Sequence, residues 1–198
     1  MHTEKYITPF YQALNRYAPV TDDSFAELMA IVTFRTIKKH EYLLRVGQVA
    51  TSRYFVSQGI LVSIYLGSNG REYVKNFFTE GNFAGSTASA LQSTPSAFAI
   101  QVLEGGVVME YNHHRYKQLI AERADLAGFY VAYLEQSWVI KNERQQLAFA
   151  TQTATERYLT FLRDYPGLDR RVPLRYIASY LGITPTQLSR IRKETTNG

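Results

Sequence analysis

The chain has 198 residues, enough for one large domain or two small ones, and a formal net charge of +5. Hydrophobic residues make up 45% and charged residues 20%, as in ordinary globular proteins, and no apolar run is long enough to cross a membrane. Cysteine is absent, which excludes disulfides and thiolate metal sites and favours a protein of the reducing cytoplasm with no membrane partner.

Two amphipathic helices are predicted near the N-terminus. The first covers about residues 9–19, with Phe10, Leu14 and Tyr17 on its apolar side. Thr21 is placed to cap the second helix, in which apolar residues recur at helical spacing. The expected buried face of this second helix consists of Phe25, Leu28, Met29 and Val32.

From Phe34 onward the apolar period changes to two, which indicates β-strands. Strands are expected over residues 34–37, 42–46, 54–56, 60–65, 72–78, 98–103 and 107–111. Ser68-Asn69-Gly70 is a hairpin turn signal, and Gly105-Gly106 is expected to separate the last two strands. Many short strands with regular turns predict a jelly roll, so residues 1–124 are assigned to a β domain with helices at its N-terminus.

A long helix is predicted after the strands. Asn112 caps a first helix, and Asp125 opens a longer one of some 25 residues to about Ala150, which spans roughly 37 Å. Its apolar positions are Leu126, Phe129, Tyr130, Tyr133, Leu134, Ile140 and Leu147. We expect one face to pack on the jelly roll and another on a second copy of the chain, so that residues 125–150 form a homodimer.

The last predicted domain, residues 151–198, begins with the capping box Thr153-Ala154-Thr155-Glu156, and its first helix ends at Pro166-Gly167. Residues 172–193 read VPLRYIASYLGITPTQLSRIRK and predict a helix-turn-helix. Pro173 suits the first turn, and Gly182 follows the last apolar residue, where a left-handed backbone ends many helices. The apolar face consists of Leu174, Ile177, Ala178 and Leu181, with Ile183 filling the gap between the two helices.

The second of these two helices has its own start signal. Thr184 is the expected cap, Pro185 fits the first helical position and Gln187 completes a capping box. Leu188 and Ile191 are expected to turn inward. The outward side therefore carries polar and basic residues.

Charge placement indicates double-stranded DNA as the partner. Residues 170–198 contain six basic residues and one acidic, whereas residues 1–169 contain sixteen of each, so the whole net charge lies on the tail. A basic patch on one element is expected where phosphates bind. Arg190 is the best candidate to read guanine, with a phosphate contact as the alternative role, and Gln187 is a candidate to read adenine. The candidate DNA-binding residues are Arg175, Thr184, Thr186, Gln187, Ser189, Arg190, Arg192 and Lys193.

This order of elements resembles the CRP/FNR family of bacterial transcription regulators. The resemblance covers residues 25–193 and is carried by FVSQGILV from Phe55, by GNFAG from Gly81 and by IASYLGI from Ile177. It implies an α+β fold with a jelly-roll sensor domain, a dimerisation helix and a winged-helix-like helix-turn-helix. It also implies a palindromic operator and RNA polymerase as a further partner. Because only four residues follow Glu194, we expect the wing that follows the second helix in this family to be missing or truncated.

A second departure lies in the effector region. The resemblance implies a Glu for the ribose and an Arg for the cyclic phosphate, yet residues 81–100 contain no charge, with Ser86 and Pro95 at the matching positions. Ile140 and Lys141 replace the hydroxyl residues that face the base. We therefore expect no response to cyclic nucleotides. Any effector is of unknown identity and is expected to be neutral or apolar. Its expected pocket consists of Gly85, Ser86, Thr87, Ser96 and Ala97.

Two other classes of protein remain as alternatives. One is a ligand-binding or protein-interaction jelly roll whose helical tail serves assembly. The other is a cupin-type enzyme, which needs several metal-binding His on different strands. No metal site, cofactor or catalytic residue is expected, because the four histidines do not suit one: His2 is terminal, His40 lies in a turn, and His113 and His114 are adjacent.

Overall fold

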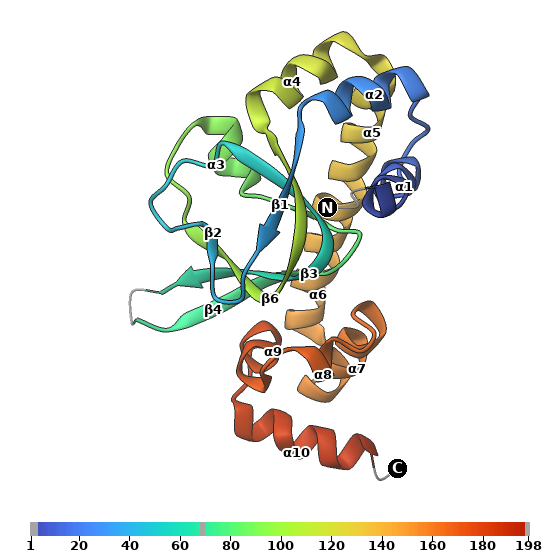
Figure 1. The fold of residues 1–198 in the computed structure, drawn as a ribbon. Helices are drawn as coiled ribbons and strands as arrows, with labels where there is room; N and C mark the ends of the chain where they lie inside the picture. The colour runs from blue at the N-terminus through green and yellow to red at the C-terminus, as the bar shows by residue number, and fades with distance from the viewer. Residues whose placement is uncertain (1–3, 68–69, 197–198) are drawn as a thin grey trace.

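The computed structural model describes residues 4–67 and 70–196. Six antiparallel strands form the sheet, in the order β1-β6-β3-β4, with β2 paired to β6 and β5 paired to β3. The strands are β1 Val32–Ile37, β2 Tyr42–Leu44, β3 Ser52–Leu66, β4 Glu72–Phe78, β5 Phe83–Ala84 and β6 Phe98–Asn112. They curl into a roll, as predicted (Figure 1).

Helices lie before, within and after this roll. Those of the first half of the chain are α1 Glu4–Asn15, α2 Asp22–Ala30, α3 Thr87–Gln92 and α4 His113–Glu122. A continuous helical rod follows, made of α5 Ala124–Leu134, the π-helical segment η1 Glu135–Ile140 and α6 Lys141–Thr151. The C-terminal helices are α7 Ala154–Asp164, α8 Leu168–Arg171, α9 Leu174–Leu181 and α10 Pro185–Thr196.

The predicted helix starts are confirmed where the signal is a local cap. The Thr21 hydroxyl accepts a hydrogen bond from the Ser24 amide, and the Asn112 side chain accepts one from the Arg115 amide. Thr153 and Glu156 form a reciprocal capping box. Each of these contacts joins residues three apart, so the sequence alone determines it.

The prediction of a break at Gly105-Gly106 is wrong, as is the separation of residues 54–56 from 60–65. β6 and β3 each run unbroken for 15 residues and pair with each other along their length. A Cβ on Gly106 would lie 2.1 Å from the Gln58 carbonyl oxygen, and one on Gly59, whose φ is +102°, would lie 2.6 Å from the Glu104 carbonyl oxygen. These glycines permit a close crossing with irregular register, not a turn.

Smaller differences concern element ends. The first helix begins at Glu4 and ends at Asn15, so Tyr17 lies beyond it, and β2 ends at Leu44. The short helices α3 and α8 are additional to the prediction. Pro173 precedes α9 as its N-terminal flank, with extended ψ of 139°, and the helix proper starts at Leu174. Of the predicted turn Ser68-Asn69-Gly70, the first two residues lie outside the described ranges.

Three hydrophobic clusters hold the fold together. One joins α1, α2, α4 and α5 to one side of the sheet, and a second fills the roll. The third combines residues of β3, β4 and β6, such as Ile60, Val74 and Phe77, with the helices α7 to α10. The C-terminal helices therefore share a core with the sheet, which fixes where α9 and α10 stand relative to the roll.

Candidate nucleic-acid interface

The α9–turn–α10 segment has the shape that the sequence predicts. Ile177, Ala178 and Leu181 are buried on α9, and Leu188 and Ile191 are buried on α10. Gly182 adopts a left-handed φ of +68°, and a Cβ there would meet the Phe149 ring at 3.0 Å. Ile183 packs against the same core. Two helices joined by such a turn are the arrangement in which the second helix enters a DNA major groove.

The start of α10 is a capping box, as predicted. The Gln187 amide donates to the Thr184 hydroxyl at 3.2 Å, and the Gln187 Oε1 accepts from the Thr184 amide at 3.0 Å and from its hydroxyl at 3.2 Å. Reading an adenine requires both ends of a glutamine side chain. Because its oxygen already accepts two bonds in the cap, Gln187 has to leave the cap before it can read a base.

The remaining candidate DNA-binding residues lie mostly on one exposed side. Thr186, Ser189, Arg190 and Lys193 are exposed on α10. Arg190 makes no hydrogen bond or ion pair with any part of the chain that the structure describes. In Figure 1, α10 lies at the end of the molecule opposite the N-terminal helices and is farther from the roll than α9. Its outward side is therefore open to a large partner.

Two other predicted arginines already have partners within the chain. Arg192 lies 3.8 Å from an Asp169 carboxylate oxygen. Arg175 donates to the Tyr176 hydroxyl at 3.2 Å, and its guanidinium lies over the ring of the same tyrosine, 4.9 Å from the centroid. Arg175 and Arg192 are themselves partly exposed, and ion pairs and hydrogen bonds of partly exposed cations contribute little to stability, so both cations can reorient toward a phosphate.

Polar contacts fix α9 on the sheet. The Val74 amide donates to the Ser179 hydroxyl at 2.9 Å, and this hydroxyl donates to the Glu72 carbonyl oxygen at 3.1 Å. Nearby, the Arg171 guanidinium binds the carboxylates of Glu80 and Glu104 at 2.6 to 3.0 Å. These bonds hold the pKa of Glu80 below its usual value, against the effect of burial. The sheet and the helix-turn-helix thus meet through strand β4.

The helical rod from α5 to α6 has two distinct parts. The apolar side of α5 is buried, with Leu126, Phe129, Tyr130 and Tyr133 packed on the first cluster. None of the residues of η1 or α6 is buried. Val131 is 53% exposed and Val139 is 63% exposed. The η1 segment is a π turn, which was not predicted. Its hydrogen bonds join residues five apart, so this turn of the rod contains one more residue than an α turn.

That extra residue aligns the two exposed valines. Two ordinary α turns take about seven residues, so positions eight apart would drift around the helix. With one π turn between them, Val131 and Val139 return to the same side. Ile140 and Leu147, both predicted apolar positions, are exposed as well.

Most of the predicted effector residues are buried, and two of them are hydrogen-bonded to each other. The Ser96 hydroxyl donates to the Ser86 hydroxyl at 3.0 Å and contacts the Phe98 carbonyl oxygen at 2.8 Å. Thr87 accepts a bond from Arg53 at 2.9 Å, whereas Ala97 is exposed. Arg53, on β3, places a cation beside residues 81–100, which contain no charged residue. Sequence reasoning missed it, because it lies 34 residues before Thr87 and only the sheet brings the two together.

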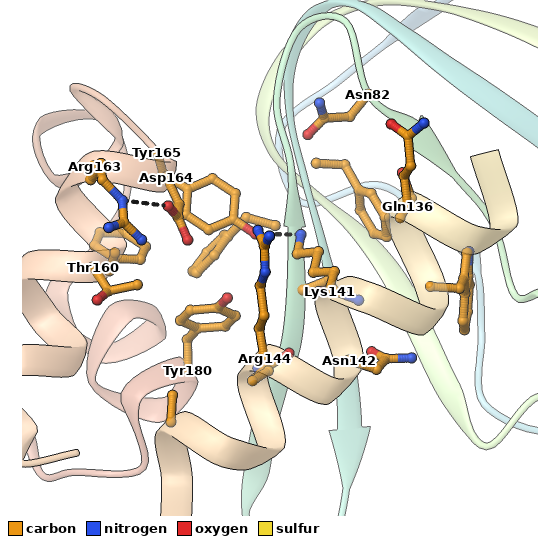
Figure 2. A pocket seen from close by; sticks show the side chains of 18 of the residues that line it. Asn82, Gln136, Lys141, Asn142, Arg144, Thr160, Arg163, Asp164, Tyr165 and Tyr180 are labelled. Carbon is orange, nitrogen blue, oxygen red and sulfur yellow. Dashed lines mark hydrogen bonds and ion pairs between the residues drawn. The ribbon is translucent and has the colours of Figure 1, made fainter. Parts of the chain in front are cut away.

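A cleft of about 710 Å³ separates the rod from the roll and the C-terminal helices. Figure 2 shows Lys141 and Arg144 extending from the rod toward Tyr165 and Tyr180, with Asn82 and Gln136 farther along. The Lys141 Nζ donates to the Tyr165 hydroxyl at 2.9 Å, and Arg163 pairs with Asp164 at 3.1 Å. Of the five predicted effector residues, Gly85 lines this cleft. The cleft has the size of a small-molecule site. Charged side chains that line it, such as Lys141 and Arg163, are already bonded to other protein groups.

Over residues 4–67 and 70–196, no helix is long and apolar enough to span a membrane. Within the same ranges, no group of three or more His, Asp and Glu side chains is placed to hold a metal ion. His2 lies outside those ranges.

Comparison with known proteins shows which proteins the chain is similar to. Residues 34–123 match the cyclic nucleotide-binding domain. The transcriptional activator protein Anr of Pseudomonas protegens is 26% identical over 168 residues, which are 79% of this chain and 68% of Anr. FixK2 from Bradyrhizobium japonicum superposes with a TM-score of 0.71 at 21% identity, over 84% of this chain and 85% of FixK2. These similarities support membership of the CRP/FNR family.

A further member of this fold group is CLP, the c-di-GMP responsive global regulator of Xanthomonas campestris. CLP superposes with a TM-score of 0.68 at 19% identity, over 89% of this chain and 92% of CLP. Anr is a transcriptional activator and CLP is a global regulator, which agrees with the expectation that this chain is not an enzyme. The α+β fold predicted from the sequence is likewise that of these structures.

Proposed function

We propose that this CRP/FNR family member is a DNA-binding transcription regulator that binds a palindromic operator as a homodimer in the cytoplasm. The observation that carries the proposal is α10, a capped helix whose exposed side bears Arg190 and Lys193 at the end of the molecule. The placement of all the net positive charge in residues 170–198 supports the same function.

Each α10 residue is assigned a role from its position. Thr186 and Arg190, near the start of the helix, face base edges, and Arg190 forms a bidentate contact to guanine. Ser189 and Lys193 bind phosphates, joined by Arg192 and Arg175 once they leave Asp169 and Tyr176. Thr184 and Gln187 hold the cap that orders the first turn. In this assignment Gln187 positions the helix rather than reading adenine.

The homodimer is proposed to form along the rod, with residues 125–150 as its interface, between the domains at residues 1–124 and 151–198. Val131 and Val139 present an apolar surface that nothing in the described chain covers. A parallel pairing about a two-fold axis places two α10 helices to read half-sites about 34–36 Å apart. RNA polymerase is the further partner such a regulator requires.

Salt dependence tests DNA binding itself. Three phosphate-binding cations per protomer, Arg175, Arg192 and Lys193, give six per dimer and a slope of log K against log salt of about −5. Fluorescence anisotropy with labelled duplex DNA at 50 to 300 mM salt measures this slope. Lys193→Ala should make the slope less negative by about 2. Absence of salt-dependent binding would instead favour a module whose helical tail serves assembly.

Insensitivity to cyclic nucleotides is the second part of the proposal. The cation near the predicted pocket, Arg53, is buried and already bonded to Thr87, and Ser86 and Ser96 bond to each other. Calorimetric titration with cyclic AMP or cyclic GMP should therefore show no saturable heat at submillimolar concentrations. Micromolar binding would contradict the proposal, and its loss in Lys141→Met would place the nucleotide in the cleft of Figure 2.

A further inference from the structure

Arg53 is a buried cation with one unused donor. It is 5% exposed and lies on β3, between the roll and the helices α4 and α5. Its Nη1 donates to the Thr87 hydroxyl at 2.9 Å, and its Nε contacts the His113 Nδ1 at 3.4 Å. Its Nη2 has no hydrogen-bond partner among the residues that the structure describes. A Cβ on Gly85 would lie 2.9 Å from the Arg53 Cδ, so this glycine leaves the room that the arginine occupies.

None of the groups around Arg53 offsets its charge. In the described part of the chain the guanidinium forms no ion pair with a carboxylate. Burial, followed by the Arg53 cation itself, lowers the pKa of His113 to about 4, so His113 is neutral at pH 7. Burial also raises the pKa of Tyr111, Tyr116 and Tyr133. A buried charge without a counter-charge is unfavourable, so whatever lies beside the guanidinium determines how its charge is balanced.

A small cavity lies at that position. It measures about 10 Å³ and is lined by Arg53, Phe83, Tyr111, Tyr116, Phe129, Tyr130 and Tyr133. Tyr130, on α5, is 8% exposed, and its hydroxyl also lacks a hydrogen-bond partner. Two of the residues that line the cavity thus carry a buried donor without a partner, one of them charged, and the cavity has room for one particle of about the size of water.

We propose that this cavity binds a small monovalent inorganic anion of the halide class, held between the Arg53 Nη2 and the Tyr130 hydroxyl. The anion accepts a hydrogen bond from each group and neutralises the guanidinium. A water molecule can accept the same two bonds but cannot offset the charge. The cavity is far too small for a nucleotide, so the site is independent of the cyclic nucleotide question. The bound anion links β3 to α5 and so fastens the rod to the roll.

Thermal unfolding under exchange of anions tests the site. Sodium chloride replaces sodium gluconate at constant ionic strength and pH 7.5, so that only the anion species changes. The Tm should rise saturably, by roughly 3–6 °C at a tenfold excess of chloride over its Kd. Bromide should act similarly, and anomalous diffraction from bromide-soaked crystals should show a peak between Arg53 and Tyr130.

Substitutions separate an anion from a water. Tyr130→Phe keeps the ring and removes one ligand, so it should raise the chloride Kd several-fold, and Arg53→Met should abolish the chloride effect. Tyr54→Phe is the matched control, because its hydroxyl bonds the Leu43 carbonyl oxygen away from the cavity, and it should keep the wild-type response. Equal Tm values in both salts, together with no bromide peak, would mean that water alone occupies the cavity and would overturn the proposal.

Discussion

The double substitution Val131→Glu/Val139→Glu should convert the protein to a monomer and weaken binding to its operator by at least about 100-fold. Both side chains lie more than half exposed on one side of the rod, and no described residue covers them. Across a two-fold axis the substitution removes apolar contact area and opposes carboxylates of like charge. Loss of the second α10 then removes the avidity of two linked half-sites, which is worth about 10²–10⁴ in affinity.

Sedimentation equilibrium at micromolar concentration measures the effect. The wild-type protein should show twice the chain mass of 22.7 kDa, and the variant should show that mass once. Leu159→Glu is the matched control, because Leu159 is a similarly exposed apolar residue on α7, which is not part of the rod. A wild-type protein that sediments as a monomer would contradict the proposed homodimer, and so would a double variant that stays dimeric.

Arg190→Ala should cost roughly 1–3 kcal/mol of binding free energy per half-site on the preferred operator and relax the preference at one base pair of each half-site. Arg190 is exposed and has no partner in the described chain, so its removal should leave the unfolding temperature unchanged. A bidentate contact to guanine explains the expected loss, because no other base offers the same pair of acceptors.

Competition binding over single-base variants of the operator, at two salt concentrations, separates this role from phosphate binding. Lys193→Ala serves as the control, and it should weaken binding to all sequences by a similar factor and reduce the salt dependence. If Arg190→Ala shows the Lys193→Ala pattern, with base preference intact, then Arg190 binds phosphate, and the base-reading assignment fails.

Local signals in the sequence were sufficient for the helix-turn-helix. The caps at Thr153 and Thr184 and the left-handed Gly182 each depend on residues within one helical turn, and each formed as predicted. The change of apolar period from helical spacing to two likewise marked where the roll begins. These features needed no knowledge of the tertiary structure.

Features that depend on distant segments were not predictable in this way. Gly105-Gly106 looks like a turn, but its glycines serve a close approach of β6 to Gln58 and Gly59, nearly 50 residues earlier. The Arg53 cation reaches Thr87 only because β3 and the start of α3 meet in the folded roll. The π turn of η1 similarly has no marker such as Pro in the sequence, although it decides which residues of the rod share a side.

The most direct test of the proposed function is selection of bound sequences from a pool of random duplex DNA, using the full chain at physiological salt. Two α10 helices related by a two-fold axis predict an enriched palindrome, with half-site centres about 10–10.5 base pairs apart or a multiple of that spacing. Each half-site should contain a guanine that the Arg190→Ala protein no longer enriches. Absence of any enriched sequence would contradict operator binding, and a single half-site without symmetry would contradict the homodimer.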